Sequence, residues 1–192
     1  KHAAENGAGA VVLKSIFEEQ ILHETEDYIN DSAKENGNSF HKGYQSVLSE
    51  REYDYEEAYS YLADHAKDLT LRKYLTFVAD AKKAVDIPVI ASINCTTAYD
   101  WHYFARRIEE AGADASLQVA PYYNKPTQEG LFQHFREIAR CTKLPLVLYS
   151  IPGRCGIEIS IQTTRLLATE CRNVVGMKEA GGTPDRVSQL RA

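Results

Sequence analysis

Continuous apolar runs alternate with helix-patterned segments along most of the chain. The runs lack polar residues at every second position, which is typical of parallel strands buried on both faces. From residue 87 onward they recur at about 30 residues, the length of one strand–helix–strand unit. We predict five parallel strands, at residues 9–14, 88–94, 116–120, 145–151 and 174–178.

The segments between these runs have apolar residues at helical spacing. Leu75, Val78 and Ala79 show this spacing, and Gly112 ends one such segment. Residues 36–54, which include Gly, Asn and Ser, indicate a long loop. We predict helices at residues 55–68, 70–85, 99–111, 127–141 and 160–171, with another that begins near Pro184.

The strand–helix repeat favours a (β/α)8 barrel over a doubly wound sheet, because no GxGxxG motif follows the first strand. A full barrel has eight strands and about 250 residues, whereas this chain has 192 residues. We therefore predict an α/β chain that forms part of a TIM barrel, as one structural domain. A self-contained open sheet is the alternative, and its unpaired edges would favour association.

The composition narrows the possible functional classes. The chain is 44% hydrophobic and 26% charged, as globular proteins are, and its net charge of −5 argues against nucleic-acid binding. No apolar run is long enough to cross a bilayer, and the first residues do not resemble a signal peptide. The cysteine and histidine spacings match no metal-ligand pattern, so we expect no metal, and reduced thiols in a cytoplasmic protein.

Candidate catalytic residues lie where predicted strands end, since sites in parallel α/β folds lie there. Lys178 ends the last apolar run, and Tyr149 belongs to the end of the preceding one. A lysine at an apolar barrel mouth can attack a carbonyl, and a neighbouring phenol can move protons. Arg154, on the following loop, could bind a carboxylate. The alternative is that Lys178 only extends to solvent or pairs with Glu179.

Residues 116–192 resemble the dihydrodipicolinate synthase and N-acetylneuraminate lyase family of class I aldolase barrels, and most closely its synthase branch. Together the matching motifs are highly specific. They are VAPYYNKPTQEG, LYSIPGR and VGMKEA, at residues 119–130, 148–154 and 175–180.

This resemblance implies roles for four residues. Lys178 would form the Schiff base with pyruvate, Tyr149 and Tyr123 would relay protons, and Arg154 would bind a carboxylate at the site entrance. It also implies a lyase without a cofactor that acts on pyruvate and an aldehyde. The active enzyme would be a homo-oligomer, because Tyr123 in this family reaches the site of a partner subunit.

The chain departs from the family pattern at several positions. Ser150 stands where the family usually has Asn, and Gly181 where it has Ser or Thr. The Thr–Thr pair that binds the pyruvate carboxylate on an early strand is not found. Residues 96–97 are Thr–Thr but follow the equivalent of the third strand, so they do not inherit that role.

The first 115 residues resemble a different family. Residues 7–15 and 87–94 are similar to dihydroorotate dehydrogenase-like flavoproteins, which are also (β/α)8 barrels, and this implies that Lys14 and Asn94 approach FMN. The two resemblances meet near residues 111–115. The sequence therefore suggests a chimera of a flavoprotein portion, 1–115, and an aldolase portion, 116–192, with divergence of one natural protein or a mis-assembled sequence as the alternatives.

Three functions follow from these patterns. The first is a pyruvate-dependent lyase, impaired if the missing Thr pair and strands are essential. The second is an FMN-dependent oxidoreductase, which lacks the glycine-rich strands that bind the flavin phosphate. The third is a non-catalytic barrel portion that associates through its open edges.

Overall fold

The computed structural model describes four stretches of the chain, residues 1–17, 55–95, 98–122 and 124–191. The chain divides into two compact units, residues 1–16 with 74–192 and residues 17–73. The sheet and the candidate site belong to the first unit. The second unit contributes the first part of one long helix to the described residues.

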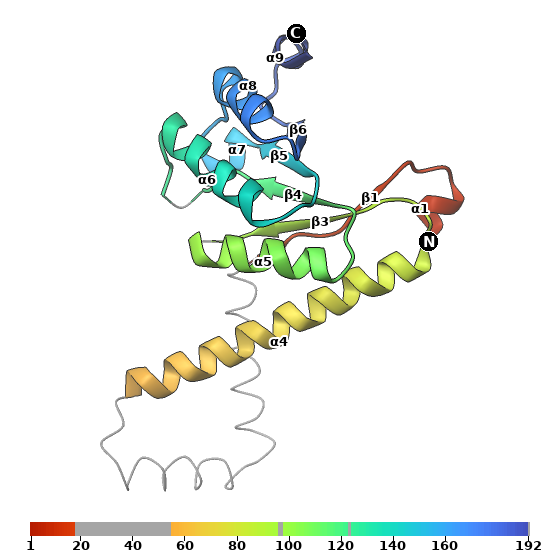
Figure 1. Cartoon of the computed structure of the whole chain (residues 1–192), viewed down its shortest axis with the longest axis vertical. Coiled ribbons are helices and arrows are strands. Elements are labelled where there is room, and N and C mark those ends of the chain that lie inside the picture. The colour runs from red at the N-terminus through yellow and green to blue at the C-terminus, as the bar shows by residue number, and fades with distance from the viewer. Residues whose placement is uncertain (18–54, 96–97, 123, 192) are drawn as a thin grey trace, which may run out of the picture. The chain divides into compact units, whose positions relative to one another are not determined.

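Five parallel strands form half a barrel in the order β1-β3-β4-β5-β6, and the short β2 also pairs with β3 (Figure 1). This confirms the predicted α/β class and the partial TIM barrel. Strands from both predicted portions, before and after residue 115, share this one sheet. The strands are β1 (Val11–Val12), β2 (Ile16–Phe17), β3 (Val89–Asn94), β4 (Ala115–Val119), β5 (Leu146–Ser150) and β6 (Val174–Glu179).

Helices connect the consecutive strands from β3 onward, as in a TIM barrel. Two of them begin at a residue whose hydroxyl accepts a hydrogen bond from a free backbone N–H of the first turn. Thr127 accepts from Gly130, and Ser160 accepts from Thr163. The helices are α1 (His2–Glu5), α4 (Tyr55–Ala84), α5 (Ala98–Glu110), α6 (Gln128–Cys141), α7 (Pro152–Cys155), α8 (Ile161–Glu170) and α9 (Pro184–Arg191).

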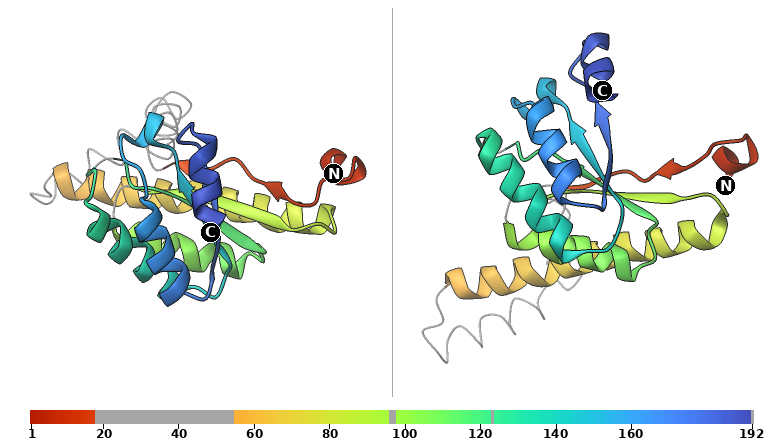
Figure 2. Two further views of the ribbon diagram at one scale, coloured as in Figure 1. Left: turned by 90° about the horizontal axis from the view of Figure 1, so that it is seen from above. Right: turned by 45° about the horizontal axis from the view of Figure 1, so that its top comes forward.

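The core of the first unit lies between the sheet and helices α5, α6 and α8, which pack along the same side of it (Figure 2). Strand residues alternate between this face and the other one. In β5, Leu146 and Leu148 are fully buried under the helices, whereas Val147 and Tyr149 are half-buried on the opposite, barrel-interior face. The alternation therefore assigns each residue near the strand ends to a face.

Some predicted elements differ from the structure. The strand predicted at residues 9–14 is only Val11–Val12, and the helices predicted at residues 55–68 and 70–85 form the single helix α4. No Gly or Pro lies between the two predicted helices, so nothing interrupts the backbone hydrogen bonds. The short elements α1, β2 and α7 were missed, and the loop predicted at residues 36–54 lies outside the described residues.

Candidate active site

The carboxyl ends of the parallel strands bring the candidate residues of β5 and β6 together. Val119 of β4 pairs with Tyr149 of β5, and Tyr149 pairs with Lys178 of β6. Residues opposite one another in register point to the same face of a sheet. Lys178 and Tyr149 therefore share the barrel-interior face at the edge where sites form in this fold.

Lys178 contacts Tyr149 directly. Its Nζ atom lies 3.8 Å from the centroid of the Tyr149 ring, close enough for a favourable interaction between a cation and the π electrons. Lys178 is exposed and Tyr149 is half-buried. The ring thus holds a primary amine at the strand end, where a small carbonyl compound in solution can reach it.

Glu179 does not pair with Lys178. Its Oε2 atom accepts a hydrogen bond from Nε of Arg186 at 2.7 Å, and its Oε1 atom accepts one from the backbone N–H of Gly181. The Glu179 and Arg186 side chains are only 8% and 10% exposed. Lys178 therefore does not form the ion pair with Glu179 that one alternative expects, and its amine lies on the other face of the sheet. Its exposure agrees with the other alternative, in which the side chain extends to solvent.

Arg154 lies in α7, the four-residue helix that directly follows β5, and its side chain is exposed. It therefore belongs to the same end of the sheet as Lys178. The adjacent Cys155 is buried, and burial raises the pKa of its thiol more than the Arg154 charge lowers it. This raised pKa argues against Cys155 as a nucleophile.

Tyr123 lies outside the described residues, but the segment that follows it is tied to neighbouring elements. The side chain of Lys125 packs near Gly156, which ends α7 in the left-handed conformation. Gln128, the first residue of α6, donates to the carbonyl of Glu158 and accepts from the backbone N–H of Ser160. These bonds join the start of α6 to the loop before α8.

The structure also places the two residues of the flavin hypothesis. Lys14 is exposed just after β1, and Asn94 is buried at the end of β3. A hydrogen bond of 2.6 Å between the hydroxyls of Ser15 and Ser92 holds the segment after β1 beside β3. The Oδ1 atom of Asn94 has no hydrogen-bond partner among the described residues.

Within the part of the chain that the structure describes, no group of three or more His, Cys, Asp or Glu side chains could hold a metal ion. The cysteines at positions 95, 141, 155 and 171 form no disulfide bonds. None of the described helices is long and apolar enough to cross a membrane.

Comparison with known proteins gives the family. The profile of the dihydrodipicolinate synthetase family matches residues 66–192, about two thirds of the chain. The chain belongs to this family. The 4-hydroxy-tetrahydrodipicolinate synthase of Campylobacter hominis is 41% identical over 119 residues, which cover 62% of this chain and 40% of that protein.

The half-barrel matches part of the solved structures of this family. The synthase from Methylacidiphilum fumariolicum SolV has a TM-score of 0.60 and 41% identity over 62% of this chain and 41% of its own. A chloride-inhibited synthase from Acinetobacter baumannii, complexed with pyruvate, has a TM-score of 0.59 and 37% identity over 63% of this chain and 43% of its own. The chain thus spans about two fifths of the length of the relatives it matches.

The family match corrects one boundary. It begins at residue 66, whereas the motifs placed the family only from residue 116, so it includes β3 and the stretch at residues 87–94 that resembles a flavoprotein. The comparisons give no support to a flavoprotein segment or to a chimera. The short apolar motif of β3 is shared by many parallel strands of barrels, which explains the misassignment.

One departure from the family pattern has a local explanation. Ser150, where the family usually has Asn, is buried, and its hydroxyl accepts a hydrogen bond from the backbone N–H of Ile159 at 3.3 Å. The Thr–Thr pair at residues 96–97 lies outside the described residues.

Sequence reasoning missed Arg186, which lies seven residues after Glu179. The only signal for it in the sequence is its position near the start of a helix that follows a strand end.

Proposed function

We propose that this chain carries the Schiff-base half of a pyruvate-dependent lyase of the 4-hydroxy-tetrahydrodipicolinate synthase kind. The observation that carries the proposal is the pairing of Lys178 with Tyr149 on the interior face, with Nζ 3.8 Å from the ring centroid. Family membership over residues 66–192 supports it, and so does the related synthase described in complex with pyruvate.

In the proposed reaction, the amine of Lys178 adds to the ketone carbon of pyruvate, and loss of water gives the imine. A proton then leaves the methyl carbon, and the resulting enamine carbon attacks the carbonyl carbon of an aldehyde. The phenol of Tyr149 would carry protons to and from the departing water. Arg154 would bind a carboxylate near the entrance, and no cofactor is needed because the imine itself accepts the electrons.

Two further features complete the proposal. Tyr123 would extend the proton relay across a subunit interface, which makes the active enzyme a homo-oligomer. Cysteines that form no disulfide bonds suit a reducing compartment, and we assign the protein to the cytoplasm.

The test is to trap the imine. The chain is mixed with pyruvate and reduced with borohydride, which adds hydride to the imine carbon and makes the bond permanent. Peptide mass should then show a pyruvate-derived adduct on Lys178. Lys178→Arg should abolish it, because the guanidinium forms no imine.

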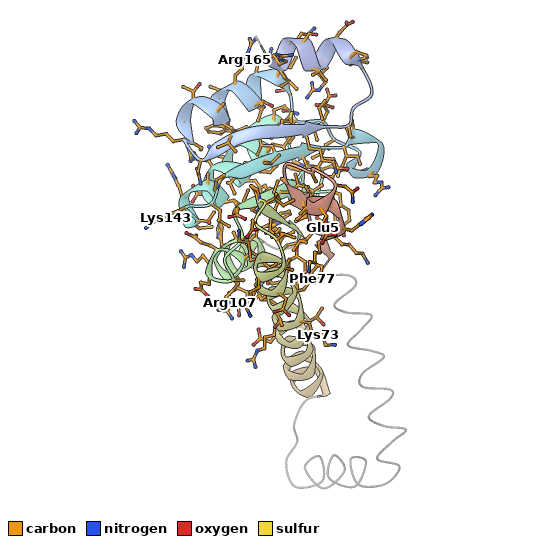
Figure 3. The ribbon with its side chains drawn as sticks, turned by 90° about the vertical axis from the view of Figure 1, so that its right-hand side faces the viewer. Glu5, Lys73, Phe77, Arg107, Lys143 and Arg165 are labelled. Atoms are coloured by element: carbon orange, nitrogen blue, oxygen red, sulfur yellow. The ribbon has the colours of Figure 1, made fainter. Side chains whose placement is uncertain are left out.

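Lys143 provides the matched control. This exposed lysine projects outward (Figure 3). It precedes β5, whereas Lys178 is near the end of β6, so the two lysines belong to opposite ends of the parallel strands. Lys143→Arg should leave the adduct on Lys178 unchanged. A correctly folded chain with no adduct on Lys178 would contradict the proposal and leave the alternative of a non-catalytic barrel portion.

A further inference from the structure

The register of β6 is poorly specified by its own side chains. Val174 is buried, but Val175 is 61% exposed, and Gly176 has no side chain to pack. The pairing of β6 with β5 also shifts opposite Leu146 and Val147. Because apolar or small residues occupy both faces, a slip of one residue would expose little new apolar surface.

A slip of one residue would nevertheless reverse the site. Lys178 would move to the helix-covered face, and Glu179 would take its place beside Tyr149. Some interaction at the end of β6 must therefore distinguish the two registers. The candidates are the bonds made by Glu179, which points away from Lys178.

Glu179 is held by bonds from two segments that follow it. Arg186, in the first turn of α9, donates from Nε to Oε2 of Glu179, and the backbone N–H of Gly181 donates to Oε1. The N–H of Ala180 continues the ladder by donating to the carbonyl of Ser150 at 2.9 Å. The carboxylate is thus satisfied only while it lies on the helix side of the sheet.

Arg186 in turn is fixed by partners outside β6. Its Nη1 atom lies 3.2 Å from the carboxylate of Glu158, and its Nη2 donates to the backbone carbonyl of Ile159. Both partners lie in the segment between α7 and α8. The guanidinium therefore connects the end of β6 to the segment between α7 and α8.

We propose that the Arg186–Glu179 ion pair sets the register of β6 and thereby positions Lys178 on the interior face. The inference rests on the proposed function of Lys178, but the register itself can be measured without it. In some proteins a buried polar or ionic group specifies register, because another register separates it from its partner. Arg186 and Glu179 act through Lys178, so both are positioning residues.

The register is measured by cross-linking cysteines across β5 and β6 in the full chain. Val147 lies opposite Gly176, and a Cβ added at Gly176 meets no atom within 4 Å. The double variant Val147→Cys, Gly176→Cys should therefore cross-link on mild oxidation, whereas Val147→Cys, Met177→Cys should not. Peptide mass identifies each disulfide among the native cysteines.

The same pairs are then examined with Arg186→Met. Cross-linking to position 177 should appear at the expense of position 176, and the pyruvate adduct on Lys178 should form about 10- to 100-fold more slowly, as expected when a reacting group is misplaced. Arg186→Lys keeps the charge but not the forked geometry, so it should restore part of both signals.

Arg165 is the matched control. It lies on α8 (Figure 3) and donates to the backbone carbonyl of Gln189 of α9 at 3.4 Å, so it also contacts α9. The hydrogen bonds of the Glu179 carboxylate come instead from Arg186 and Gly181. Arg165→Met should change neither the cross-links nor the trapping rate. If the effect came only from a loss of contacts to α9, Arg165→Met and Arg186→Met would change the cross-links and the trapping rate equally. Equal effects would overturn the proposal.

Two further outcomes are decisive. If Arg186→Met keeps the 147–176 cross-link and the original trapping rate, the ion pair does not position Lys178. If the unmodified chain forms no adduct, the proposed function fails, and the cross-linking pattern still decides the register. Should Arg186→Met fail to fold, Glu179→Gln, which keeps the side-chain volume, is judged by the same two measurements.

Discussion

Tyr149 offers the site two separate groups, its ring and its hydroxyl. The ring face lies 3.8 Å from Nζ of Lys178 and holds the amine in place. The hydroxyl is the group that the proposed chemistry needs, because imine formation requires a proton donor for the departing water. The two contributions can be separated, since one substitution removes the hydroxyl alone.

Tyr149→Phe should therefore slow imine formation without loosening Lys178. We expect borohydride trapping of pyruvate to be about 100-fold slower, the usual contribution of a positioned proton donor, while circular dichroism stays unchanged. Tyr149→Leu, which also removes the ring, should be slower still. Equal trapping rates for Tyr149→Phe and the unmodified chain would exclude the phenol as the proton carrier.

The sequence predicts the bounds of four strands closely and those of one strand poorly. The strands at residues 88–94, 116–120, 145–151 and 174–178 lie within a residue or two of β3 to β6, because each is an apolar run bounded by polar or turn residues. The segment at residues 9–14 has a similar composition but only two residues pair, since pairing depends on the neighbouring strand.

Some contacts of the candidate site can be predicted from the sequence, and others cannot. Lys178 and Tyr149 could be placed together from strand periodicity, because parallel strands align their carboxyl ends. The Arg186–Glu179 pair could not, since its partners are separated by a turn at Gly181 and Gly182 whose path the sequence does not specify. Ionic contacts across such turns depend on the finished packing.

The turn at Gly181 leaves little room for a side chain. A Cβ on Gly181 would come within 2.6 Å of Oε1 of Glu179 and 3.0 Å of Oε1 of Glu158, so both carboxylates would have to move. Gly181→Ala should lower the free energy of unfolding by about 1 kcal/mol, the lower end of the usual cost of overpacking, because both oxygens lie at the ends of flexible side chains. Urea unfolding curves would measure the change.

Gly153 is the control for this substitution. It lies in α7, and an added Cβ there would meet no atom within 4 Å. Gly153→Ala should therefore leave the urea midpoint nearly unchanged or raise it slightly. If the two alanine variants unfold at the same urea concentration, the carboxylates around Gly181 are not closely held, and the ion pair described above loses its support.

The stability of the first unit should depend on pH through His134, which packs between α5 and α6. Its ring lies edge-on to Trp101, with 5.0 Å between the ring centroids, and it also contacts Phe135. Burial, and to a lesser extent the charge of His102, lower the pKa of His134 from 6.5 to about 4. The folded state therefore favours the neutral ring.

The sign of the effect follows from proton binding. Between about pH 4 and pH 6.5 the unfolded chain binds a proton at His134 that the folded chain does not. The free energy of unfolding therefore falls as the pH falls through this window. Above the window, His134 contributes no pH dependence. His134→Leu removes this dependence. The Nε2 atom of His134 has no hydrogen-bond partner among the described residues, so the substitution breaks no hydrogen bond of that atom.

Urea unfolding at several pH values tests this. Trp101 is the single tryptophan of the chain, so its fluorescence reports on the α5–α6 contact itself. The unmodified chain should lose stability faster than His134→Leu as the pH decreases from 6.5 to 4.5, and the two should run parallel above pH 7. His2→Gln, at an exposed histidine of α1, should behave like the unmodified chain. Equal slopes for the unmodified chain and His134→Leu would mean that His134 is protonated in the folded state, and that the contact with Trp101 tolerates its charge.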